Sequence, residues 1–221
     1  MDNHIRNLLN RLKNKGNMEE LYDTYEQQGI DLFKKGNIED STEVFIELVE
    51  IAKKHKENKI VARTYYNLGL NYSKIPDYNS AINYYNESIK LFKQLKDQRR
   101  LAIVLDNNSK CLERNNEYVK SLNVALDALD IWSNLNEINF IHDTLITVGI
   151  SLRKIILLGI ETNFVPITSQ LGELHDKLVS TTKSYDQKKY VDTMNQLRIV
   201  KSELSRREHK RTHVKSDDEW S

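Results

Sequence analysis

The chain repeats one pattern of bulky, small and polar positions. Residues 64–88 read TYYNLGLNYSKIPDYNSAINYYNES. Apolar and aromatic side chains recur there at helical spacing, first over residues 65–72 and again over residues 78–88. Pro76 separates the two stripes, because proline disfavours a helical conformation at the residue before it. The stretch therefore predicts two helices joined by a tight turn.

The same pattern returns after every forty residues without an insertion. A small residue stands at the centre of each predicted first helix: Gly29, Gly69, Ser109 and Gly149. The stripe of the second helix also has a small residue at its centre, Ala81, with Ser41 and Ser121 at the equivalent positions. A small side chain allows the two helices of a pair to approach closely. An internal period of this length indicates a solenoid of helical hairpins.

The order of side chains resembles that of a tetratricopeptide repeat. The residues that carry the resemblance are Tyr65, Leu68, Gly69, Tyr72, Ala81 and Tyr85. The repeat is longer than the usual one of about 34 residues and resembles the repeats of kinesin light chains and of bacterial regulators that sense short peptides. The resemblance implies an all-α fold: a right-handed superhelical solenoid of antiparallel helix hairpins whose first helices line a concave surface.

Apolar stripes and turn-prone pairs predict where the repeats begin and end. We expect three hairpins at residues 18–57, 59–97 and 99–136, with internal turns at Gly36-Asn37, Pro76-Asp77 and Asn115-Asn116. The fourth hairpin departs from the pattern. Its first helix is predicted at about residues 138–158, a loop follows over residues 159–165, and Pro166 suits the start of another helix.

The ends of a solenoid need polar covers. We therefore expect four parts: an N-terminal capping helix at residues 1–17, four hairpins over 18–183 with the fourth degenerate, a charged C-terminal capping helix at 184–209, and a disordered tail at 210–221. A solenoid needs no single globular core, so we treat the chain as one elongated domain.

Composition narrows the function further. Charged residues make up 29% of the chain and the net charge is +1, which does not favour polyanion binding by the chain as a whole. One cysteine, Cys111, suits a reducing compartment such as the cytoplasm. The start does not read as a signal peptide, and there is no run of about 18 uncharged apolar residues to span a membrane. Glycine-rich phosphate loops, nucleophile elbows and zinc-ligand pairs are missing, so we expect neither an enzyme nor a cofactor.

The face opposite the packing stripe of each first helix contains two rows of candidate binding residues. One row consists of short hydrogen-bonding side chains: Gln27, Asn67, Asn107 and Thr147. The other consists of cations: Lys34, Lys74, Arg114 and Lys154. Arg63, Tyr66 and Lys110 are further candidates on this face. Such a groove predicts binding of a protein or peptide in an extended conformation. The cations favour an acidic segment or a C-terminal carboxylate.

A structural interpretation competes with this one for the cations. Each is expected at the end of its helix, where positive charge stabilises the helix dipole by about 0.3–1 kcal/mol. Some proteins of the family that this chain resembles bind the C-termini of chaperones through a set of lysines, asparagines and an arginine. We do not expect that function here, because Glu26 and Ile30 stand where this set needs a cation and an amide.

The C-terminal stretch is basic. Residues 183–215 contain ten cations and four anions, which makes phosphate contacts a candidate. Tyr190 is assigned to packing, so no aromatic platform for nucleic-acid bases is evident. His209 and His213 have metal-ligand spacing, but a third ligand is not evident nearby, and we expect no metal site.

The sequence thus predicts a non-enzymatic adaptor or scaffold that binds a protein or peptide in its groove. A peptide-responsive regulator that switches an output partner is the alternative. A nucleic-acid-associated factor acting through residues 183–215 ranks below both.

Overall fold

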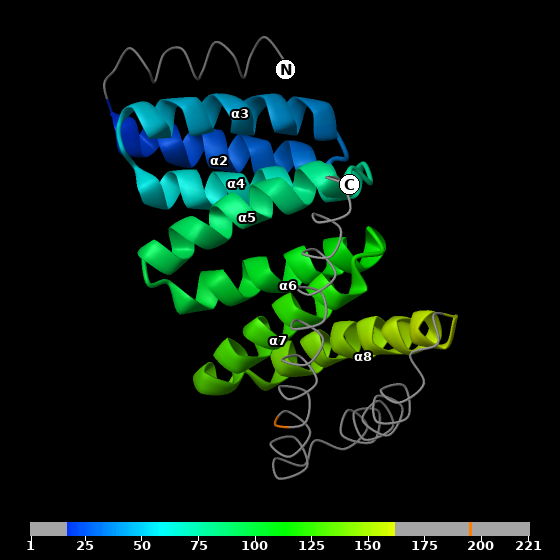
Figure 1. The fold of residues 1–221 in the computed structure, drawn as a ribbon. Coiled ribbons are helices and arrows are strands. Elements are labelled where there is room, and N and C mark those ends of the chain that lie inside the picture. Colours follow the sequence, from blue (N-terminus) through cyan, green and yellow to red (C-terminus); the bar gives the residue numbers. More distant parts are fainter. Residues whose placement is uncertain (1–16, 162–194, 196–221) are drawn as a thin grey trace, which may run out of the picture. The chain divides into compact units, whose positions relative to one another are not determined.

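The computed structural model describes residues 17–161 and residue 195 (Figure 1). All regular structure in this part of the chain is α-helical. The helices are α2 (Met18–Lys34), α3 (Ile38–Lys54), α4 (Asn58–Lys74), α5 (Tyr78–Gln94), α6 (Gln98–Arg114), α7 (Tyr118–Leu135) and α8 (Ile138–Glu161). The expected N-terminal cap before residue 17, the helix after Pro166, the C-terminal tail and, apart from residue 195, the C-terminal cap fall outside the described residues.

The forty-residue period is confirmed in the helix boundaries. The first helices α2, α4, α6 and α8 begin at Met18, Asn58, Gln98 and Ile138. The second helices α3, α5 and α7 begin at Ile38, Tyr78 and Tyr118. The predicted internal turns at Gly36, Pro76 and Asn115-Asn116 all lie between helices. The helices of the first hairpin, α2 and α3, and those of the second, α4 and α5, pack against each other, as the small-residue pattern predicts. Helices α3 and α4 also pack together, as do α7 and α8.

The connections share one hydrogen-bonded geometry. After α2, the Gly36 N–H donates to the Phe33 carbonyl at 3.0 Å and the Asn37 N–H donates to the Leu32 carbonyl at 3.0 Å. These bonds satisfy carbonyl groups that the end of a helix leaves free. Gly36 has φ +82°, a left-handed conformation that glycine adopts at little cost.

Other connections use residues less suited to this conformation. Lys56, Lys96, Asn116 and Asn136 take up positive φ at equivalent positions. Pro76 has no N–H to donate, so the turn between α4 and α5 keeps the bond from Asp77 N–H to the Tyr72 carbonyl at 3.0 Å. Asp77 also caps α5, because its Oδ1 accepts from the Ser80 N–H at 3.1 Å. Hydrogen bonds from Ser80 lower the pKa of Asp77.

In two hairpins, the close approach of paired helices brings a glycine of the first helix against an aromatic ring of the second. A Cβ added at Gly29 would lie 2.5 Å from ring carbons of Phe45, and one at Gly69 would lie 2.5 Å from ring carbons of Tyr85. Phe45 and Tyr85 are each 1% exposed. The rings therefore lie directly on the backbone of the partner helix, which explains why both positions require the smallest residue.

Backbone contacts divide the chain into two units, Met1–Cys111 and Leu112–Ser221. The first contains α2–α5 and most of α6, with a core that includes Tyr25. The second contains α7 and α8, where Trp132 is fully buried and stacks on Phe140 with ring centroids 4.4 Å apart. Each unit thus has its own aromatic core.

Buried polar pairs join consecutive hairpins at equivalent positions. In the first unit, Asn71 Nδ2 of α4 donates to Ser41 Oγ of α3 at 2.9 Å and to Thr42 Oγ1 at 3.0 Å. Eighty residues later, Ser121 Oγ of α7 and Ser151 Oγ of α8 lie 2.8 Å apart. Both pairs occupy one register of the repeat, and at the intervening equivalent of that register the chain has Ala81 and Cys111 instead.

The end of α8 corrects one boundary. The sequence predicts a helix to residue 158 and a loop from Gly159, but α8 continues to Glu161. A single glycine costs a helix interior only about 1 kcal/mol relative to alanine. The apolar residues on both sides of Gly159 suit a helix and outweigh that cost.

Candidate protein-binding site

Three first helices form most of a cavity of about 370 Å³ in the first unit. Helices α2, α4 and α6 each contribute side chains, and α5 contributes one. The lining residues are Glu26, Arg63, Tyr66, Asn67, Phe92, Arg100, Ile103 and Val104. Three of them, Arg63, Tyr66 and Asn67, are sequence-predicted site residues, so these three are brought together.

An ion pair crosses one wall of this cavity. Arg63 Nε of α4 donates to Glu26 Oε1 of α2 at 2.9 Å, and Arg63 Nη2 contacts Glu26 Oε2. Two parallel contacts make the pair bidentate, which is a strong geometry for arginine and carboxylate. The Arg63 and Glu26 side chains are 23% and 20% exposed, so water reaches the pair from the cavity side.

Burial is the main cause of a lowered pKa at Arg63, and the nearby charge of Arg100 lowers it further. The carboxylate of Asp23 acts in the opposite direction. Arginine remains protonated at any physiological pH, so the shift has no effect on its charge state. Arg63 and Arg100 line the same cavity, where their like charges oppose each other.

Arg100 is the more accessible cation of the cavity. Its Nη1 lies 2.6 Å from Asp97 Oδ2, and its side chain is 45% exposed. Burial alone would raise the pKa of Asp97, but hydrogen bonds from Arg100 and the charges of Arg100 and Lys59 lower it. Arg100 therefore remains beside a charged carboxylate while its guanidinium borders the cavity.

Aromatic and aliphatic groups supply the rest of the wall. Tyr66 packs on Tyr85 with ring centroids 6.1 Å apart, and burial raises the pKa of its hydroxyl group. Phe92 and Val104 are each 1% exposed, and Ile103 is half-buried. The cavity thus combines an apolar base with charged groups, an arrangement typical of sites that bind protein side chains.

The predicted hydrogen-bonding row does not form a uniform open ladder. Gln27 is exposed and donates from Nε2 to Asp31 Oδ1 at 2.8 Å. Asn67 is 9% exposed and borders the cavity. Asn107 donates to its own helix, at the Ile103 carbonyl, at 2.9 Å, and its Nδ2 lies 3.5 Å from the Tyr66 hydroxyl. Thr147 is 5% exposed and belongs to the second unit. The prediction missed this because strict forty-residue spacing ignores the neighbours that cover each position.

The predicted cation row is exposed but lies outside the cavity lining. Lys34, Lys74 and Arg114 are the last residues of their helices, where they stabilise the helix dipole. Lys154 corrects the expectation that every member ends its helix, because α8 continues to Glu161. Lys110 is exposed on α6 and also lies outside the cavity lining.

Sequence reasoning missed part of the cavity. Glu26 was considered only as a departure from a chaperone-binding pattern, and Arg100 was not considered. Arg100 lies three residues before Ile103, which is the forty-residue equivalent of Arg63. A search extended by one helical turn from each candidate position would have found Arg100, since residues three apart share a helix face.

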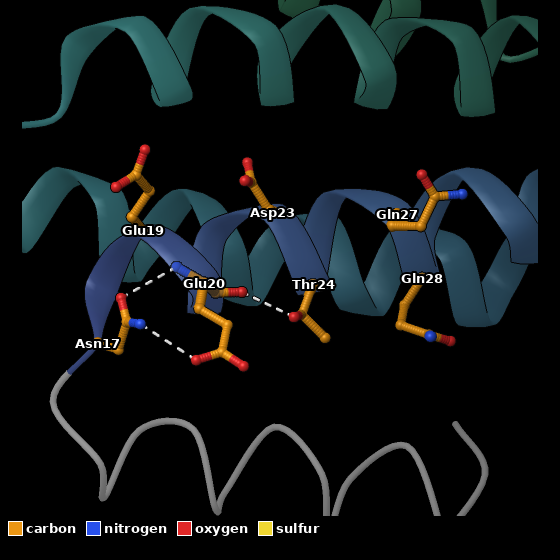
Figure 2. Close-up of a pocket in the computed structure, with 7 residues that line it drawn as sticks. All are labelled: Asn17, Glu19, Glu20, Asp23, Thr24, Gln27 and Gln28. Atoms are coloured by element: carbon orange, nitrogen blue, oxygen red, sulfur yellow. Dashed lines mark hydrogen bonds between the residues drawn. The ribbon is translucent and has the colours of Figure 1, made fainter.

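A second hollow, of about 610 Å³, lies along α2 (Figure 2). Its lining residues are Asn17, Glu19, Glu20, Asp23, Thr24, Gln27 and Gln28. Asn17 Oδ1 accepts from the Glu20 N–H at 3.3 Å, and Asn17 Nδ2 donates to Glu20 Oε2 at 3.1 Å. These contacts form a helix cap, and acidic residues stabilise the first turn of a helix. Helix capping therefore explains much of the acidic character of the residues that line this hollow, and a ligand is not needed to account for it.

A third hollow lies beside a group of tyrosines on the first unit. It measures about 540 Å³ and includes Tyr65 and Tyr84. Tyr84 stacks on Tyr72 with centroids 5.3 Å apart, and Lys53 Nζ lies 5.2 Å from the centre of the Tyr65 ring. These contacts join α3, α4 and α5, so these tyrosines act in packing.

Residues 17–161 and residue 195 contain no group of three or more histidine, cysteine, aspartate or glutamate side chains able to hold a metal ion. In this part of the chain, no helix is both long and apolar enough to cross a membrane. Cys111 is buried.

The comparisons with known proteins agree with the helical-repeat fold described above. Residues 20–94, which run from α2 to the end of α5, match the family model described as tetratricopeptide repeat. These residues are tetratricopeptide repeats. They are of the long type, because the helix boundaries recur at forty residues rather than at the usual spacing of about 34. Tetratricopeptide repeats generally mediate contacts between proteins.

One solved structure extends the likeness beyond the matched repeats. The chain resembles the crystal structure of BtubC (BKLC) from P. vanneervenii with a TM-score of 0.63 and 17% sequence identity. The alignment covers 82% of this chain and 73% of that chain. At this identity the likeness shows a shared helical-repeat fold. No curated protein sequence matches the chain.

Proposed function

We propose that the protein is a non-enzymatic adaptor whose tetratricopeptide repeats bind a segment of another protein in the cavity between α2, α4 and α6. The observation that supports this most is the joint presence of an apolar base and accessible guanidinium groups on the first helices. The proposal places the protein in the cytoplasm, for which the single buried cysteine Cys111 is suited.

The chemistry of the cavity favours an extended segment that carries an acidic side chain. Two arginines and one glutamate line it, so cations outnumber anions. Phe92, Ile103 and Val104 offer apolar contact beside them. A carboxylate next to an apolar side chain would match both features, because charge complementarity determines specificity while apolar contact contributes affinity.

A pair of matched substitutions tests the adaptor proposal. A photo-crosslinking amino acid at Ile103 should capture a partner in cells, whereas the same group at Ile46, 40% exposed on α3, should not capture that partner. Ile103→Arg should then abolish binding of the identified partner, and Ile46→Arg should preserve it. Circular dichroism checks that both variants remain folded. Equal crosslinking from the two positions would refute the cavity as the binding site.

A further inference from the structure

The two arginines of the cavity differ in where their carboxylate partners come from. Asp97 immediately precedes α6, three residues before Arg100, and is not part of the cavity lining. Glu26 lies on α2 and Arg63 lies on α4, and both line the cavity. Only the Glu26–Arg63 pair therefore joins two helices within the cavity lining.

Both sides of that pair are partly accessible. The side chains are 23% and 20% exposed, and both border the cavity. An incoming carboxylate could reach Arg63 from the cavity, and Glu26 could turn toward solvent when released. Exchange of one carboxylate for another keeps the guanidinium paired, so the large cost of leaving a half-buried charge alone is avoided.

The guanidinium group of Arg100 favours the exchange at Arg63 when the incoming group is an anion. Arg63 and Arg100 both line the cavity, and the charge of Arg100 lowers the pKa of Arg63. A carboxylate placed between Arg63 and Arg100 would reduce this repulsion. A cationic ligand that took the place of Arg63 at Glu26 would instead add positive charge beside Arg100. The arrangement therefore selects an acidic side chain rather than a basic one.

We propose that Glu26 is an internal competitor for the ligand: it occupies Arg63 in the free protein and is displaced by a carboxylate of the bound segment. The inference rests on the proposed function and adds that Glu26 lowers affinity and sets a threshold for acidic partners. Neutral segments gain nothing from displacing Glu26, so the pair also discriminates against them.

Fluorescence anisotropy with the full chain tests this role. The probe is a labelled, C-terminally amidated peptide in which serine and glutamate alternate, and the control peptide replaces each glutamate by glutamine. Glu26→Gln should bind the acidic probe about five- to tenfold more tightly than wild type, because it removes one competing unit charge at a partly screened site. The glutamine oxygen still accepts a hydrogen bond from Arg63, which keeps the variant folded.

Two further variants identify the cause of any gain. Glu50→Gln changes the net charge by the same amount on the exposed surface of α3, and its affinity should change less than about twofold. Arg63→Gln should weaken binding, and in the double variant Glu26→Gln with Arg63→Gln the gain should disappear. The glutamine control peptide should bind wild type and Glu26→Gln equally.

The inference is overturned if Glu26→Gln binds no more tightly than Glu50→Gln, if the gain survives in the double variant, or if the acidic probe binds no variant. These outcomes are separable from failure of the adaptor proposal. Loss of a cellular partner in Ile103→Arg, together with unchanged affinity in Glu26→Gln, would retain the cavity as a binding site and reject only the competitor role.

Discussion

Helices α4 and α8 occupy the same place in the forty-residue repeat but expose different side chains. Their cores correspond: Leu68 and Val148 are both buried, at 1% and 0% exposure. On the neighbouring face, Tyr66 of α4 is half-buried in the cavity, whereas its equivalent Ile146 is 50% exposed. The repeat therefore constrains the packed face of each first helix closely. The face that carries Tyr66 or Ile146, here called the open face, is free to vary.

The open faces also differ in charge. Arg63 of α4 pairs with Glu26, while the equivalent residue of α8 is the exposed Asp143. Several apolar residues of α8 are exposed as well: Ile138, Ile146, Ile150, Leu157 and Leu158. The site that we propose thus belongs to the α4 version of the repeat and is not reproduced on α8.

The packed side of α4 should show the largest effect of any single change. Gly69→Ala should reduce the free energy of unfolding by about 3 kcal/mol, because the new Cβ would overlap the buried Tyr85 ring. Chemical denaturation measures the loss. Combining Gly69→Ala with Tyr85→Leu should cost at least about 1 kcal/mol less than the sum of the single changes, since the smaller side chain relieves the overlap. Additive costs would contradict this explanation.

The polar links at the shared register should differ in strength. Asn71→Ala removes a buried hydrogen bond to Ser41 and a partly buried one to Thr42, and should cost about 2 kcal/mol. Ser151→Ala removes one bond to Ser121 and should cost about 1 kcal/mol. Urea denaturation compares the two variants. An equal cost would mean that the second bond of Asn71 contributes little.

The open faces should respond differently to the same polar substitution. Tyr66→Ser should cost about 1.5 kcal/mol, because it removes a half-buried ring that packs on Tyr85. Ile146→Ser should change the stability by less than about 0.5 kcal/mol, since the side chain is half exposed. Thermal unfolding of the two variants checks the difference. A large loss at Ile146 would show that α8 packs more like α4 than its exposure indicates.

The smallest expected effect concerns the turns that precede α4 and α8. Lys56 has φ +59° and Asn136 has φ +55°. Lys56→Gly should raise the free energy of unfolding by about 0.5 kcal/mol, because relief of left-handed strain exceeds the added entropy of the unfolded chain. Asn136→Gly should have almost no effect, since asparagine tolerates this conformation. Guanidinium denaturation of both variants measures the contrast, and equal gains would contradict it.

Much of the fold followed from the sequence alone. The forty-residue period, the helical hairpins and the small residues at which paired helices approach closely were all predictable. Each depends on local spacing and on contacts between neighbouring helices, which repeat along a solenoid. The extension of α8 past Gly159 was not predictable, because one glycine weakens a helix without always ending it.

The candidate site depended far more on the tertiary structure. Residue type and spacing placed Arg63, Tyr66 and Asn67 on one face of a helix. Only packing between helices determined that Glu26 reaches Arg63 and that Arg100 joins the same cavity. The physical reason is that helix periodicity determines the direction of a side chain on its own helix. Its partners on other helices depend on how those helices are rotated and spaced against one another.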